Sequence, residues 1–310
     1  MVKTELIIVG GGVAGLTAGL YAARARLDTV VLERLGTGGQ MVNAGTVENF
    51  PGFPGGVRGY DLAPLIAEQA MAAGVRIEYA EARTVRREAA TFVVATDGED
   101  FRARAVIVAA GSTLARLGVP GEAELTGRGV SSCAVCDGEF FRDEHVVVVG
   151  GGDSAFDEAL ELAGVAARVT IVHRRAEPRA ARVLVERARE HPKIAFRWNT
   201  TVQAIEGGET VEAVRLRGLD GTSERLAAAG VFVYVGLRPN SALVEGLVAT
   251  DAAGHIPVDP WLRTAVPGLL AAGDIRQHSA RQFITSAGDG ATAALAAERF
   301  LRRGEWPHGD

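Results

Sequence analysis

The chain has 310 residues, 47% of them hydrophobic and 23% charged, which is typical of a folded globular protein with two domains. The 33 basic and 38 acidic side chains leave a net charge of −5, the wrong sign for holding nucleic acid by its phosphates. The longest uncharged apolar run, Leu226 to Leu237, has 12 residues, fewer than the ~20 of a membrane helix. We therefore expect neither a nucleic acid nor a membrane as a partner. The amino-terminal sequence lacks the pattern of a secretory signal, and we expect a cytoplasmic protein.

A strand, a glycine-rich turn and a helix follow one another at the start of the chain. Residues 5–9 predict a short apolar strand and 16–26 a helix, and the sequence Gly10-Gly-Gly-Val-Ala-Gly15 joins them. Glycines in such a turn allow a sharp bend and the close approach of a pyrophosphate, whose charge the amino terminus of the helix stabilises. The pattern predicts a dinucleotide site at Gly10, Gly12, Ala14 and Gly15.

The residue at the end of the next strand indicates which dinucleotide binds. The strand predicted at 29–32 ends at Glu33, whose carboxylate can accept hydrogen bonds from ribose hydroxyls, so we assign FAD to this first site. Asp274 ends an apolar strand at 268–274 and is a candidate for the ribityl hydroxyls of FAD, with a helix cap as the alternative role. Further candidate FAD contacts lie in loops and at strand ends: Gly39, Gln40, Asn49, Val85, Gly111, Gly273, Arg281, Gln282 and Phe283.

The same pattern occurs a second time along the chain. A strand at 145–149, a glycine turn at 150–155 and a helix to about 163 precede a strand at 168–172. No carboxylate ends that strand, and a histidine and three arginines follow it instead. Arginines bind a 2′-phosphate through charge-assisted hydrogen bonds, so we assign NADPH here, with a solvated basic helix start as the alternative. The candidate residues are Gly150, Gly152, Asp153, Ser154, Ala155, His173, Arg174, Arg175 and Arg179.

The chain has two cysteines, Cys133 and Cys136, just ahead of the second glycine turn. Their Cys-x-x-Cys spacing brings the sulfurs within bridging distance, so the pair can cycle between disulfide and dithiol. The alternatives are two inert buried thiols, or a zinc site, which needs four ligands although no second cysteine pair is present. Asp137 could carry protons to and from the sulfurs. With FAD and NADPH, the pair predicts a relay from hydride to flavin, then to the disulfide, then outward by thiol exchange.

These motifs together resemble those of the low-molecular-weight thioredoxin reductases. The resemblance covers nearly the whole chain, through residues 10–15, 38–40, 47–52, 133–138, 150–155, 173–179, 271–274 and 281–288. It implies an α/β fold of two Rossmann-like, three-layer ββα dinucleotide-binding domains, with the NADPH domain inserted into the FAD domain. The FAD-binding domain would comprise 1–113 and 243–310, and the NADPH-binding domain, 114–242, would carry the cysteine pair. The resemblance also implies a homodimer.

The resemblance further implies an order of events. Cys136 matches the cysteine nearer the flavin, and Cys133 matches the one that attacks thioredoxin or a thioredoxin-like protein. Asp137 matches the acid that protonates a departing thiolate. Because the nicotinamide site and the disulfide share one domain, that domain is expected to rotate between steps.

Departures from the family pattern concern the partner. A family arginine is Leu65 here, and the aromatic residue after Asp-Gly is Glu139, which would alter partner docking. Three alternative functions stay open besides a different disulfide partner. They are an NADH-dependent flavoprotein that serves a peroxidase system, an FAD-dependent dithiol oxidase that passes electrons to oxygen, and a redox-sensing flavoprotein without turnover.

Overall fold

The computed structural model describes residues 1–306, which divide into two compact units. The first unit comprises 1–113 and 238–306, and the second comprises 114–237. The chain passes between the units in β11 (Ser112–Leu114) and β20 (Leu237–Pro239), two short strands that pair with each other. The second boundary lies at 237/238, five residues before the predicted boundary at 242/243. The last four residues of the predicted segment 243–310 lie outside the described residues.

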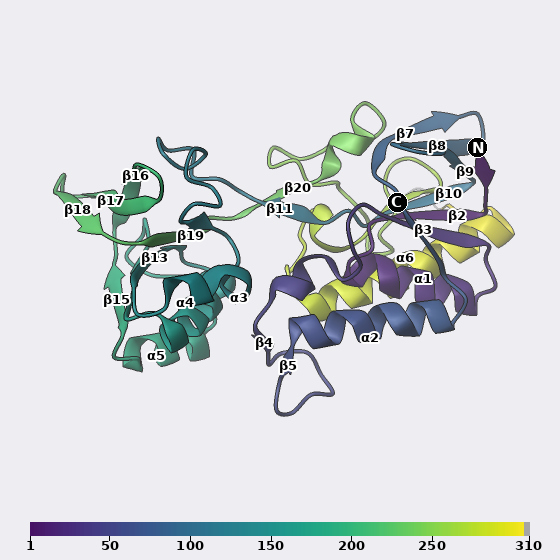
Figure 1. Ribbon diagram of the computed structural model, residues 1–310. Coiled ribbons are helices and arrows are strands. Elements are labelled where there is room, and N and C mark those ends of the chain that lie inside the picture. Colours follow the sequence, from purple (N-terminus) through teal and green to yellow (C-terminus); the bar gives the residue numbers. More distant parts are fainter. Residues whose placement is uncertain (307–310) are drawn as a thin grey trace. The chain divides into compact units, whose positions relative to one another are not determined.

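The first unit has three layers (Figure 1). Its central layer is a parallel sheet in the order β21 (Leu269–Ala271), β10 (Ala105–Val108), β2 (Leu6–Val9), β3 (Thr29–Glu33) and β6 (Arg76–Tyr79). A second sheet has the order β1 (Val2–Lys3), β9 (Phe101–Ala103), β8 (Thr91–Thr96) and β7 (Ala82–Glu88). The third layer is helical, and its α1 (Val13–Arg24) packs against α2 (Gly59–Ala72) and α6 (Phe283–Arg303). A short ribbon of β4 (Thr46–Val47) and β5 (Val57–Arg58) precedes α2.

Alternate residues of β2 face the two outer layers of this unit. Leu6 and Ile8 belong to a core shared with α1 and α6, whereas Ile7 and Val9 belong to a core shared with β7, β8 and β9. All four side chains are at most 5% exposed. A strand that is covered on both faces needs apolar side chains at every position. This is why the sequence shows a continuous apolar run here instead of alternation.

The second unit repeats this architecture. Its parallel sheet has the order β12 (Val130–Ser131), β19 (Gly230–Tyr234), β13 (His145–Gly150), β14 (Arg168–Val172) and β15 (Ile194–Arg197). An antiparallel sheet consists of β16 (Thr200–Gly207), β17 (Val211–Gly218) and β18 (Ser223–Ala227). The helices are α3 (Ala134–Asp137), α4 (Asp153–Val165) and α5 (Arg182–Glu190). The predicted α/β class, with one three-layer ββα unit inserted into another, is confirmed.

The strand β13 alternates between two cores in the same way as β2. Val146 and Val148 pack with residues of α4 and α5, and Val147 and Val149 pack with residues of β16 and β17. In each unit the glycine turn therefore follows a central strand that both outer layers hold in place. Within residues 1–306, no helix is long and apolar enough to cross a membrane.

Candidate functional site: two dinucleotide cradles and a redox-active cysteine pair

The glycines of the first turn meet different steric demands. Gly10 has a φ of +108°, and a Cβ there would lie 2.4 Å from the Ala109 carbonyl oxygen, so this position requires glycine. A Cβ at Gly15 would lie 1.8 Å from the Gly10 carbonyl oxygen, so only glycine lets α1 approach β2 this closely. Gly12 has open space beside it, because the nearest atom to such a Cβ would be 3.9 Å away.

The amino terminus of α1 presents free hydrogen-bond donors at this open space. The helix begins after Gly12, and no side chain caps its first N–H groups. Unpaired donors and the positive end of a helix dipole are the features that bind a pyrophosphate. The residues of the first turn therefore fit the phosphates of a dinucleotide.

A cavity of about 1150 Å³ opens where the parallel strands of the first unit end. Its lining includes the residues that directly follow β2, β3, β6, β10 and β21. The carboxyl ends of parallel strands meet at one edge of a sheet, which is where ligands bind in such folds. Ten of the predicted FAD contacts line this cavity: Gly10, Gly12, Ala14, Glu33, Gly39, Gln40, Gly111, Gly273, Asp274 and Phe283.

Backbone donors fix the carboxylate of Glu33 at the cavity wall. Its Oε2 accepts a hydrogen bond from Gly11 N at 2.7 Å, and its Oε1 accepts one from Leu35 N at 3.0 Å. Each carboxylate oxygen has two lone pairs, so both oxygens can still accept a hydrogen bond from a ribose hydroxyl. Gln40 is held as well, since its Nε2 donates to the Ser112 carbonyl at 3.3 Å.

Asp274 lies in a short 3₁₀ turn, Gly273–Ile275, at the end of β21. Its Oδ1 accepts hydrogen bonds from Ser279 Oγ at 3.0 Å and Ser286 Oγ at 3.5 Å. Burial raises the pKa of Asp274, while these hydroxyls and the charge of Arg281 oppose the rise. The residues at the N-cap positions of this turn and of α6 are Ala272 and Gln282, so Asp274 does not have the alternative role of a helix cap.

The other predicted FAD contacts do not line the cavity. Gly15 packs on the backbone of the turn, and Val85 is 3% exposed in the core between the two sheets. Asn49 Nδ2 donates to Gln282 Oε1 at 3.0 Å, and Arg281 contacts the ring of His255 at 3.4 Å. The nearest cavity-lining residues of β7 are Ala82 and Arg83 rather than Val85.

Asn240 lines the cavity, although it belongs to none of the motifs in the sequence. Its Nδ2 donates to the Ala110 carbonyl at 2.7 Å, and its backbone N–H donates to the Gly111 carbonyl at 3.0 Å. These two bonds join segments about 130 residues apart in the chain and hold the loop after β10 in place. An asparagine directly after a strand that ends in Pro239 is the only local signal that could have indicated this role.

The second glycine turn has the same open position. A Cβ at Gly152 would meet nothing within 4 Å, and α4 begins directly after Gly152 without a side-chain cap. By contrast, a Cβ at Gly150 would lie 2.6 Å from the Tyr234 carbonyl oxygen, and one at Gly151 would lie 2.3 Å from the His173 ring. Asp153 Oδ1 accepts a hydrogen bond from Ala181 N at 2.8 Å, while Ser154 is exposed and Ala155 is buried. The turn fits a second pyrophosphate.

A buried histidine and three exposed arginines follow β14. His173 is 8% exposed, and its Nε2 has no hydrogen-bond partner among the residues that the structure describes. Burial lowers the pKa of His173, a hydrogen bond with the Glu177 backbone opposes this, and the charges of the three arginines lower it further. The three cations thus gather around one buried ring and expose their guanidinium groups: Arg174, Arg175 and Arg179. This cluster fits a dianionic phosphate.

The two cysteines form a disulfide in the second unit. Cys133 and Cys136 are joined across α3, with their Cα atoms 5.3 Å apart. Cys133 is 9% exposed, whereas Cys136 is exposed. The bond excludes the zinc alternative for this state of the pair, because a disulfide offers no thiolate to a metal.

Asp137 reaches the pair through a serine. Ser131 Oγ donates to Asp137 Oδ2 at 2.6 Å and accepts a hydrogen bond from the Cys133 backbone N–H at 3.1 Å. No motif in the sequence points to this serine, which lies two residues ahead of Cys133. The carboxylate is therefore held beside the pair, where it can exchange a proton with a sulfur that is released from the disulfide.

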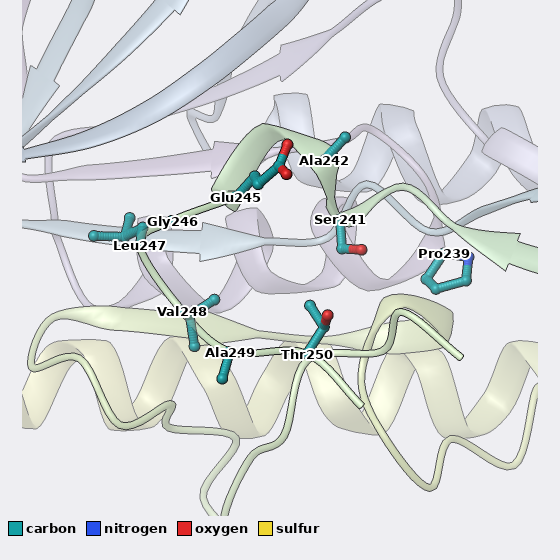
Figure 2. A pocket seen from close by; sticks show the side chains of 9 residues that line it. All are labelled: Pro239, Ser241, Ala242, Glu245, Gly246, Leu247, Val248, Ala249 and Thr250. Carbon is teal, nitrogen blue, oxygen red and sulfur yellow. The ribbon is translucent and has the colours of Figure 1, made fainter. Parts of the chain in front are cut away.

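A smaller cavity of about 630 Å³ lies in the first unit against the segment 239–250 (Figure 2). It is lined by Pro239 and by residues of the following turn and loop, among them Ser241 and Glu245. The side chain of Ser241 donates to the Gly254 carbonyl at 2.6 Å, so it supports the loop itself. No predicted site residue lines this cavity, and we assign it no ligand.

Two glycine cradles, with a cysteine pair in the same unit as the second cradle, define a nucleotide-dependent disulfide oxidoreductase. The chain belongs to the pyridine nucleotide-disulphide oxidoreductase family, whose model matches residues 4–291.

Relatives and solved structures agree with this assignment. The chain is 43% identical over 298 residues to a thioredoxin reductase of Treponema pallidum (strain Nichols), covering 96% of this chain and 97% of the relative. It is 45% identical over 299 residues to one of Mycolicibacterium smegmatis, covering 96% of both chains. The crystal structure of Lactococcus lactis thioredoxin reductase matches with a TM-score of 0.95 and 40% identity, over 96% of this chain and 99% of that chain. The resemblance stated from the motifs is confirmed.

Proposed function

We propose that this protein is an NADPH-dependent thioredoxin reductase, which passes electrons through FAD and the Cys133–Cys136 disulfide to thioredoxin or a thioredoxin-like protein. The observation that carries the proposal is the disulfide on α3, in the same unit as a dinucleotide cradle with an arginine cluster. Two relatives that match this chain over nearly their whole length, at 43% and 45% identity, are named thioredoxin reductase.

The first unit holds FAD in this proposal. Glu33 accepts hydrogen bonds from the adenosine ribose, the amino terminus of α1 binds the pyrophosphate beside Gly12, and Asp274 accepts from the ribityl hydroxyls. Phe283 and Ser286 line the cavity at the start of α6, whose amino terminus also lacks a side-chain cap. Positive dipole ends stabilise negative charge on a bound group.

The second unit holds NADPH. The amino terminus of α4 binds the pyrophosphate beside Gly152, and the arginines around His173 bind the 2′-phosphate. The low pKa of His173 keeps its ring neutral near pH 7, so its Nε2 can accept or donate a hydrogen bond without adding charge. When bound, NADPH supplies a hydride and FAD transfers the two electrons onward.

The chemistry of the cysteine pair is thiol–disulfide exchange. Reduction breaks the Cys133–Cys136 bond with two electrons, so that one sulfur takes a proton, which Asp137 is placed to exchange, and the other sulfur is left as a thiolate. The Cys133 thiolate then attacks one sulfur of the partner disulfide and expels the other sulfur as a thiolate, which takes a proton. Cys136 then gives up its proton, attacks Cys133 and restores the disulfide, and the second sulfur of the partner leaves as a thiolate that takes a proton, so the partner is released as a dithiol. Cys133 is the less exposed sulfur, so its attack requires outward movement once the bond is open.

Two further assignments accompany this function. A chain that keeps a dithiol partner reduced at the expense of NADPH belongs in a reducing compartment, so we place it in the cytoplasm. We also propose a homodimer, on the family likeness alone. Light scattering of the FAD-loaded protein tests the homodimer, and a mass of one chain would contradict it.

Anaerobic mixing of the FAD-loaded protein with NADPH, followed by oxidised thioredoxin, tests the function. We expect NADPH to bleach the flavin absorbance, and we expect thioredoxin to restore the absorbance while two thiols form per thioredoxin. A flavin that NADPH does not bleach would contradict the proposal. Bleaching without thiol formation would indicate a different disulfide partner, and bleaching by a small dithiol in place of NADPH would indicate a dithiol oxidase.

A further inference from the structure

A buried carboxyl group, that of Glu158, lies beneath the helix that carries the cysteine pair. Glu158 belongs to the middle of α4 and is 9% exposed. Its Oε2 accepts a hydrogen bond from the Ala134 backbone N–H at 2.6 Å and a second one from Tyr234 Oη at 2.8 Å. Ala134 directly follows Cys133 and begins α3, which packs on α4 (Figure 1). One oxygen atom thus joins the cysteine-bearing turn to the end of β19.

Glu158 belongs to a helix whose buried residues help to form the apolar core of the second unit, and within residues 1–306 the charged groups that act on its pKa are acidic. The core around it contains Phe156, Leu162 and the ring of Tyr234. The titratable groups that face this network are acidic or neutral: Tyr234 on β19, Asp157 and Glu161 on α4, and Asp137 on α3. Burial raises the pKa of Glu158 to about 7, although its bonds from Ala134 and Tyr234 oppose the rise. The group therefore changes protonation state near neutral pH.

The function proposed above gives Glu158 no role, although the bond to Ala134 connects it to the reacting sulfurs. Reduction of the disulfide converts a neutral S–S bond into two sulfurs, one of which can carry a negative charge. A negative charge in a poorly solvated site raises the proton affinity of a nearby carboxyl group. Two such groups titrate as a coupled pair.

We propose that Glu158 is a positioning residue for the Cys133–Cys136 pair and that its carboxyl group takes up a proton from solvent when the pair is reduced. This inference rests on the proposed function. The two electrons enter the S–S bond, one sulfur binds a proton, and the other sulfur stays a thiolate while Glu158 binds the second proton. Asp137, on the more exposed side of α3, remains free to serve the partner's thiolate.

The sign of the resulting pH dependence follows from linkage. The reduced pair raises the proton affinity of Glu158. In the pH range where the carboxyl group is ionised in the oxidised protein but protonated in the reduced protein, reduction therefore takes up one extra proton. Reduction then becomes less favourable as the pH rises through about 7. A carboxyl group that only holds the turn in place would give no such dependence.

Glu158→Gln separates the two roles, because the amide oxygen can still accept both hydrogen bonds but the side chain cannot titrate. The FAD-loaded protein is equilibrated anaerobically with reduced and oxidised dithiothreitol from about pH 5.5 to about pH 8.5, and its free cysteines are alkylated and counted by mass. The measured quantity is the ratio of two equilibrium constants for reduction of the cysteine pair, that of the natural chain divided by that of the variant. We expect this ratio to be constant below about pH 6 and to fall at least ~3-fold by about pH 8. A ratio that stays level across the range overturns the proposal.

Two further variants sharpen this test. Tyr234→Phe removes a hydrogen-bond donor that stabilises the Glu158 carboxylate, so reduction of the pair should become less favourable at a higher pH than in the natural chain. This variant also tests the proposal if the glutamine variant does not fold. A fall at the unchanged pH in the phenylalanine variant would contradict the proposal. Glu186→Gln is the matched control, since Glu186 is exposed on α5, and its curve should overlay that of the natural chain. Neither NADPH nor thioredoxin is present, so failure here is distinct from failure of the proposed function.

Discussion

The two dinucleotide units begin alike and end differently. Both place an open glycine, Gly12 or Gly152, at the uncapped start of a helix, which is what a pyrophosphate needs. They differ at the end of the second strand, where the first unit has Glu33 and the second has His173 followed by arginines. In the proposed function, the shared feature binds the pyrophosphate of either dinucleotide, and the feature that differs selects which dinucleotide binds.

The third position of the turn shows a second difference. Gly15 contacts the Gly10 carbonyl so closely that a Cβ would lie 1.8 Å from that oxygen, whereas Ala155 fits in the second unit. Gly10 has a positive φ of +108°, and Gly150 is not among the glycines with a positive φ. The first glycine turn is therefore tighter at this position than the second one.

Exchanging these residues should give the largest effect. Gly15→Ala is expected to cost about 3 kcal/mol of folding free energy and to leave the protein without FAD, because the new Cβ displaces α1 from the turn. The reverse change, Ala155→Gly, removes one buried methyl group and should cost about 1 kcal/mol. Urea unfolding and the flavin content after purification measure both. Equal losses in the two variants would contradict the difference in packing.

A third difference lies further along the two helices. Glu158 follows Gly150 by as many residues as Ala18 follows Gly10, so a buried carboxyl group in the second unit takes the place of a fully buried alanine in the first. The pKa of Glu158 is raised to about 7, so the folded protein binds this proton more tightly than the unfolded chain does. The stability that the proton contributes is complete below about pH 4.5 and is lost as the pH rises through about 7.

The variant Glu158→Gln should therefore gain stability relative to the natural chain as the pH rises. We expect a relative gain of about 2 kcal/mol between about pH 5 and about pH 8, measured by urea unfolding at each pH. Glu186→Gln, at an exposed position of α5, should show less than a quarter of that change. A gain that is the same at every pH would mean that Glu158 does not titrate in this range.

The arginine cluster should give a smaller and more selective effect. Arg174→Ala is expected to weaken NADPH binding by about tenfold and to leave NADH binding nearly unchanged. The loss corresponds to about 1.5 kcal/mol, the contribution of one charge-assisted hydrogen bond. The KM values for both coenzymes measure this selectivity. Arg189→Ala, an exposed arginine of α5, is the control and should change neither value. Equal loss of affinity for both coenzymes would show that the arginine does not bind the 2′-phosphate.

Local patterns predicted the parts of the molecule that adjoin the glycine turns. The strands predicted at 5–9, 29–32, 145–149 and 168–172 match β2, β3, β13 and β14 to within a residue at each end. These strands are buried on both faces, so their apolar runs are long enough to read without a partner strand. The helix predicted at 16–26 begins earlier, at Val13, because the helix starts within the glycine turn itself.

Contacts between distant segments could not be predicted in the same way. Asn240 bonds to Ala110, and Tyr234 bonds to Glu158 across 76 residues of chain. The prediction of Val85 as an FAD contact missed by only a few residues. Its side chain faces the core, while Ala82 and Arg83 of the same strand line the cavity. Which residues of an exposed antiparallel strand reach a neighbouring site depends on register, and this strand has a bulge between Ala82 and Thr84.

The most direct test of the proposed electron relay uses Cys133→Ser, with Ser132→Ala as the matched control beside it. Each variant is mixed anaerobically with NADPH and oxidised thioredoxin, and flavin absorbance and new thiols are followed together. We predict that NADPH bleaches the flavin of both variants, that the control forms thioredoxin thiols at the natural rate, and that Cys133→Ser forms none. Sustained thioredoxin reduction by Cys133→Ser would contradict the account.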